Sequence, residues 1–129
     1  NAGAAFAAYA ARALRIDPRL REARFNLAYA RLLQGDGRKA FQVLEGLVAA
    51  EPDYAPARFL LGVAAAGLGE EERAAEAFSF LAKSPFGPAL GEALREAGRR
   101  LSSAGRRLEA GRLATWIDRQ ASAADAAAG

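Results

Sequence analysis

Apolar side chains recur along this chain at spacings of three and four residues, which is the pattern of amphipathic helices. The clearest example is segment 39–50, whose apolar face comprises Ala40, Val43, Leu44, Leu47 and Val48. Such a face has to be buried against a second element. Stretches with glycine or proline interrupt the pattern, and helices are expected to end there. The chain is therefore predicted to form seven helices and no strand, over residues 3–16, 21–34, 37–50, 55–68, 71–83, 88–103 and 106–121.

The pattern overlays on itself when the chain is shifted by 34 residues. The segment 23–25 then falls on 57–59 with the same residues, and Gly35 falls on Gly69. Further matching pairs are Leu27 with Leu61, Ala40 with Ala74, Leu44 with Phe78 and Leu47 with Leu81. The C-terminal part follows at an offset of 36, because segment 84–88 contains two extra residues. An internal repeat of this length indicates a stack of two-helix units that share one core.

The repeated residues resemble the tetratricopeptide repeat family. The resemblance rests on Leu27-Ala28, Gln34-Gly35-Asp36, Ala40, Leu44, Glu51-Pro52, Leu61-Gly62, Leu68-Gly69, Ala74, Phe78 and Pro85. It implies an all-α fold, a right-handed superhelical stack of antiparallel helix hairpins (an α-solenoid) with about three and a half repeats. It divides one domain, 3–120, into a half repeat (3–18), two repeats (21–54 and 55–87) and a divergent repeat (88–120).

In this family the first helix of each hairpin lines a concave groove that binds another protein. By resemblance, the groove residues of this chain are Phe25, Asn26, Tyr29, Phe59, Leu60, Val63, Arg95 and Arg99. Exposed apolar patches mark binding surfaces, and aromatic residues and arginine dominate the energetics of interfaces. Phe25 and Phe59 can also pack between neighbouring helices. The resemblance thus implies a scaffold or adaptor module that binds a peptide or helix of a partner protein.

Catalysis is disfavoured by the residues that are missing. The chain has no cysteine and no histidine, so thiol nucleophiles, imidazole bases and nearly all zinc sites are excluded. The acidic cluster Glu70-Glu71-Glu72 follows Gly69 at a predicted helix start, where negative charge caps the helix and favours its dipole. No glycine-rich phosphate-binding motif is present. We therefore expect no enzyme, no catalytic residue, no cofactor and no metal site.

Two other functions remain open. Nucleic acid or an anionic membrane could bind the C-terminal arginines, which are Arg95, Arg99, Arg100, Arg106, Arg107 and Arg112. The net charge is only +3, and Glu92, Glu96 and Glu109 interleave with these arginines at helical spacing, which favours surface ion pairs. The second alternative is a homo-oligomeric scaffold that associates through an open repeat end. Uncovered apolar residues are expected there. At one end these are Phe6, Tyr9, Ala13 and Ile16, and at the other they are Leu113, Trp116 and Ile117, unless the alanine-rich tail folds over them.

The termini and the composition bear on origin and location. Asn1 and Ala2 are consistent with a cloning scar, and the chain has no methionine, so we expect the native N-terminus to be missing. Residues 121–129 are rich in alanine and are expected to fray. The abundance of alanine, arginine and glycine is typical of a GC-rich bacterial genome. No apolar run approaches the roughly 18 residues that span a bilayer. The compartment, cytoplasm or periplasm, stays open.

Overall fold

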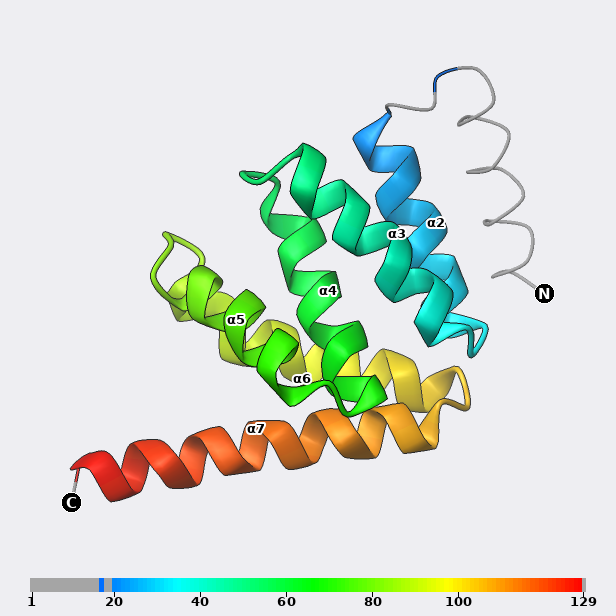
Figure 1. Cartoon of the computed structure of the whole chain (residues 1–129). Helices are drawn as coiled ribbons and strands as arrows, with labels where there is room; N and C mark the ends of the chain where they lie inside the picture. The colour runs from blue at the N-terminus through cyan, green and yellow to red at the C-terminus, as the bar shows by residue number, and fades with distance from the viewer. Residues whose placement is uncertain (1–16, 18–19, 129) are drawn as a thin grey trace.

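The computed structural model describes Asp17 and residues 20–128 of the chain. These residues form α2 (Arg21–Leu33), α3 (Gly37–Ala50), α4 (Ala55–Leu68), α5 (Glu71–Ala82), α6 (Gly87–Ser103) and α7 (Arg107–Ala128), as Figure 1 shows. No strand occurs among them, which confirms the all-α prediction, and each helix begins within one residue of its predicted start. The helix predicted over 3–16, with the apolar residues assigned to it, lies outside the described residues.

Three turns with the same hydrogen bonds join α2 to α3, α4 to α5 and α6 to α7. Their glycines, Gly35, Gly69 and Gly105, have φ angles of 87°, 79° and 82°, a region that glycine adopts without steric cost. The residue after each glycine donates its N–H to a helix carbonyl at 2.8 Å, in the pairs Asp36 to Arg31, Glu70 to Ala65 and Arg106 to Leu101. These bonds satisfy carbonyls that a helix C-terminus leaves free. The glycines predicted to break the helices therefore do so with one shared geometry.

Small residues let the helices approach closely. Ala28, Ala40 and Ala74 are completely buried. Gly62 lies on α4 where a Cβ atom would be 2.5 Å from the ring of Phe78 on α5. The main packed pairs are α2 with α3, α3 with α4, and α4 with α5. Most buried apolar residues of α2 to α7 form one connected core cluster.

The apolar residues of the last helix that were expected to be open at the C-terminal end are buried or partly buried. α7 packs against both α4 and α6, and Figure 1 shows it crossing the lower ends of α4 and α5. Trp116 lies 4.7 Å from Phe78, measured between ring centroids, and both Trp116 and Leu113 are buried. Ile117 is partly buried against the same cluster. The expectation that Leu113, Trp116 and Ile117 lack cover is wrong, because α7 packs these side chains against α4, α6 and Phe78 of α5.

α7 also continues past its predicted end at residue 121 and reaches Ala128. The side chains of residues 121–127 are exposed, so packing does not hold this part in place. Alanine loses no side-chain entropy in a helix and buries no polar group, so an alanine-rich segment keeps a helical backbone without tertiary contacts. The predicted helix end was therefore wrong for this segment.

Candidate functional site

Two apolar pockets lie between α2, α4 and α6 and meet at Phe59 and Ala93. The central pocket has a volume of about 230 Å³, and its lining includes Tyr29, Leu33, Phe59, Leu60, Val63 and Arg100. The aromatic pocket has a volume of about 280 Å³, and its lining includes Phe25, Pro56, Phe59, Leu81, Phe86 and Leu90. Together they form a continuous groove, named the α2–α4–α6 groove below. Small-molecule sites are commonly about 300–1,000 Å³, so these shallow pockets fit single side chains better than a whole ligand.

The aromatic residues predicted for the groove line it. Phe25, Tyr29 and Phe59 are all partly exposed there. Phe25 also makes an edge contact with Tyr54, and Phe59 makes one with Phe78, each at 6.3 Å between ring centroids. Both interpretations of the phenylalanines therefore hold, because each ring packs on a neighbour with one side and faces the groove with the other.

The remaining predicted residues are less well placed. Leu60 and Val63 form the floor of the central pocket, but they are only 3% and 1% exposed and belong to the core. Asn26 lines neither pocket, and neither do Arg95 and Arg99. The arginine that reaches the groove is Arg100, next to the predicted Arg99. A shift of one residue turns a helix by about 100°, which decides which side chain faces a neighbouring helix.

Phe86 is a groove residue that the sequence analysis did not identify. It is 60% exposed and forms one wall of the aromatic pocket. It lies in segment 84–88, where the repeat offset changes from 34 to 36. That change was the available signal, since an insertion in a regular repeat maps to a loop on one face of the stack.

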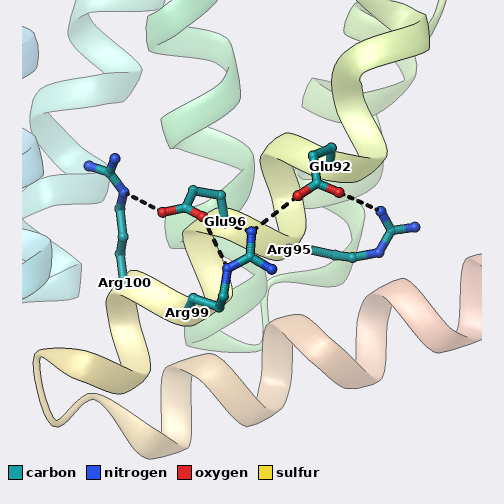
Figure 2. Close-up of polar contacts among 5 residues, drawn as sticks. All are labelled: Glu92, Arg95, Glu96, Arg99 and Arg100. Atoms are coloured by element: carbon teal, nitrogen blue, oxygen red, sulfur yellow. Dashed lines mark hydrogen bonds and ion pairs between the residues drawn. The ribbon is translucent and has the colours of Figure 1, made fainter.

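Charged residues form a network along the exposed side of α6, which Figure 2 shows. Glu96 accepts hydrogen bonds from Arg99 at 2.7 Å and from Arg100 at 3.1 Å. Glu92 accepts from Arg95 at 3.3 Å and from Arg99 at 3.1 Å. Arg100 reaches across to α2, where it donates to the hydroxyl of Tyr29 at 3.2 Å. The predicted ion pairs at helical spacing are confirmed for Arg95, Arg99 and Arg100.

The network predicts a shifted titration of Glu96. Hydrogen bonds from Arg99 and then Arg100 hold the pKa of this carboxyl below its ordinary value of 4.5. Replacing Arg99 with glutamine should raise the pKa of Glu96, because the hydrogen bond that lowers this pKa most comes from Arg99 and is then lost. A lowered pKa means that Glu96 contributes stability above its ordinary pKa, and that this contribution is lost as the pH falls through its folded value. An NMR titration of the side-chain carboxyl carbon measures the shift. Arg95→Gln is the matched control, since Arg95 pairs with Glu92, and an equal shift in both variants would contradict the assignment.

Several of the other C-terminal arginines contact the protein itself. Arg112 donates to the carbonyl of Gly67 at 3.1 Å, at the C-terminal end of α4, where a cation favours the helix dipole. Arg106 donates to the carbonyl of Ala104 at 3.4 Å, and Arg119 pairs with Glu71. These contacts tie the three arginine side chains to neighbouring parts of the protein.

The acidic cluster lies at the start of α5, as predicted, but one detail differs. Glu71 and Glu72 are in the first turn of α5, where they favour the helix dipole. Glu70 occupies the cap position without a side-chain cap hydrogen bond, and it pairs instead with Arg38 at 3.4 Å. Within Asp17 and 20–128, no group of three or more acidic side chains is arranged to hold a metal ion. No helix in the same part of the chain has the length and hydropathy needed to cross a membrane.

Comparisons with known proteins leave the family open. A scan against protein-family models found no match, and a search of curated proteins found no significant relative.

Proposed function

We propose that this chain is a protein-interaction module that binds a segment of another protein in the α2–α4–α6 groove. The observation that carries the proposal is an apolar groove in which Phe25, Phe59 and Phe86 remain partly or largely open to solvent. Contiguous exposed apolar surface on a protein of this size marks an interaction site, and partly exposed aromatic rings are typical of its hot spots.

The resemblance to tetratricopeptide repeats supports the same site. In that family the first helix of each hairpin faces the partner, and α2, α4 and α6 occupy these positions in the repeats of this chain. The equivalent turns at Gly35, Gly69 and Gly105 support the division into repeats. We propose on these grounds that the helix pairs stack as in a short α-solenoid.

Binding is favoured over catalysis by the polar groups that the groove contains. Its one carboxylate, Glu96, is held ionised by two arginines, and a lowered pKa is unsuited to proton transfer near neutral pH. The other ionisable side chains of the groove are Tyr29 and Arg100, and Arg100 donates a hydrogen bond to the hydroxyl of Tyr29. The groove therefore supports recognition of a partner rather than acid–base chemistry.

The two alternatives find less support. Nucleic-acid or membrane binding is less supported, because Glu92 and Glu96 lie among Arg95, Arg99 and Arg100 and offset most of their positive charge. Self-association was expected because apolar residues at both ends of the stack were predicted to be uncovered. At the C-terminal end this reason no longer holds, because Leu113 and Trp116 are buried. The apolar residues expected to be uncovered at the N-terminal end lie outside the described part of the chain.

A groove variant tests the proposal. Tyr29→Ala combined with Phe59→Ala removes two rings that line the central pocket and keeps the charges of α6. Binding of partners captured from the native organism should weaken by about tenfold or more, as expected when interface aromatics are truncated. Affinities are measured for each recovered partner after thermal melting and circular dichroism establish that the variant is folded.

The matched control is Phe80→Ala, which removes a ring that is 44% exposed and lines neither pocket. Partners that bind this control like the unmodified protein but fail on the double variant use the groove. Recovery of the same partners by the folded double variant would place the binding site elsewhere. Loss of binding in Arg106→Glu plus Arg107→Glu, with nucleic acid among the partners, would favour the polyanion alternative.

A further inference from the structure

The aromatic pocket is held in place by the loop that separates α5 from α6. The hydroxyl of Ser84 donates to the carbonyl of Leu81 at 2.6 Å and accepts the backbone N–H of Phe86 at 3.1 Å. Gly87 follows, and a Cβ atom there would collide with the carbonyl oxygen of Ala82. These contacts fix the backbone that presents Phe86, so the ring is exposed without being on a loosely held segment. Binding a large apolar side chain beside it then costs little ordering of the loop.

The lining of this pocket contains no polar side chain. It comprises phenylalanine, leucine, alanine and proline residues only. An extended peptide pressed into it would bury backbone N–H and C=O groups without hydrogen-bond partners, which is unfavourable. A helix satisfies its backbone groups internally and can bury apolar side chains alone. The described residues also offer no strand edge to pair with an extended segment.

The distance between the two pockets also fits a helix. Leu90 lines the aromatic pocket and Ala97 lines the central pocket, two turns further along α6, which is about 10 Å at 1.5 Å per residue. Residues i and i+7 of a partner helix are separated by the same distance on one face.

The positive charge beside the central pocket is complementary to an acidic group. Both carboxylates of the α6 network already accept hydrogen bonds from two arginines each. Arg100 donates to Glu96 and to Tyr29, and a guanidinium has further N–H donors beyond these two. The network therefore has unused donors and carries more positive than negative charge, since three arginines face two glutamates (Figure 2). A carboxylate is the complementary group.

From these observations we infer that the occupant of the groove is an amphipathic helix of a partner protein. A large apolar side chain of this helix fills the aromatic pocket beside Phe86, and a second one, two turns away, enters the central pocket. An acidic side chain next to the second anchor meets Arg100. This inference rests on the proposed function and adds the conformation, the spacing and the charge of the bound segment.

Two peptide-display libraries test the inference on the intact protein. Both use peptides of about 14 residues, roughly 20 Å long as a helix. One library has a helix-forming background of alanine and glutamine, and the other has alternating β-branched and polar residues with proline at both ends. Binders should come from the helical library, with large apolar residues at i and i+7 and an aspartate or glutamate beside the second. Their affinity is then measured by fluorescence anisotropy.

Three variants separate the possible outcomes. Phe86→Ala should weaken the selected peptides by about tenfold or more, whereas Phe80→Ala should change their affinity less than about twofold. Arg100→Gln should remove the preference for the acidic residue. Since Phe86 is an exposed loop residue, its truncation should leave the melting curve unchanged.

The contrary results are equally distinct. Binders from the extended library would overturn this inference and leave the groove as the site. The same conclusion would follow from helical binders whose affinity is unchanged by Phe86→Ala but is lost with Tyr29→Ala plus Phe59→Ala. Peptides whose affinity is unchanged by both groove variants would overturn the proposed function as well. Libraries that yield no binder above background would do the same.

Discussion

Truncating Phe78→Ala is expected to lower the free energy of unfolding by about 3–5 kcal/mol, the range for deletion of a buried aromatic side chain. The ring is 2% exposed and lies where α4, α5 and α7 meet. It contacts Phe59 on α4, Trp116 on α7 and the bare backbone at Gly62. Alanine would leave a cavity bounded by three helices, and the well-packed neighbours can collapse into it only in part.

Urea denaturation measures this loss, and Trp116 reports where it occurs. The chain has one tryptophan, so its fluorescence follows the contact between α5 and α7. The emission of the folded variant should shift to longer wavelength as water reaches the indole. Phe80→Ala is the control, two positions along the same helix and partly exposed, with an expected loss below about 1 kcal/mol. Midpoints equal to the unmodified protein for Phe78→Ala would mean that this ring is not part of the core.

The substitution Leu44→Ala is expected to cost about 2–5 kcal/mol. Leu44 occupies on α3 the repeat position that Phe78 occupies on α5, and it is completely buried. Its side chain packs in the core cluster that joins α2, α3 and α4, so the lost apolar contacts and the cavity both contribute.

The same urea experiment checks this value, with an unchanged slope as evidence that unfolding stays cooperative. Leu108→Ala is the matched control, since it deletes the same side chain from an exposed position on α7. Its expected effect is within about 0.5 kcal/mol. Similar losses for Leu44→Ala and Leu108→Ala would show that the repeat pattern does not identify buried positions.

Local patterns predicted most of the secondary structure. The starts and ends of α3 and α4 coincide with the predicted bounds, because apolar spacing, proline near the start of α4 and glycine at Gly35 and Gly69 act over a few residues only. The end of α7 was missed for the opposite reason. No breaker occurs between residues 121 and 128, and the lack of large apolar side chains was taken as a lack of structure, although an alanine-rich segment favours a helix.

The groove was predicted only in part. Three of its aromatic residues follow from the resemblance to tetratricopeptide repeats, which implies that the first helix of each hairpin lines a groove. Phe86 and Arg100 do not, because one lies in an irregular loop and the other depends on the exact rotation of α6 against α2. Leu60 and Val63 were assigned to the open surface, yet both are buried in the core and form the floor of the central pocket.

What the sequence determined by itself is the helical units, since residue spacing, glycine turns and helix propensity are properties of short segments and do not depend on distant neighbours. Tertiary structure alone decided how these units meet: that α7 covers Phe78 and the end of α4, that Arg100 bridges to Tyr29, and that Phe86 forms a pocket wall. Those features bring together residues far apart in the chain, and their geometry depends on the packing angle and rotation of whole helices. Many similar amphipathic faces could satisfy the same pattern, and only close packing of the particular side chains selects one arrangement.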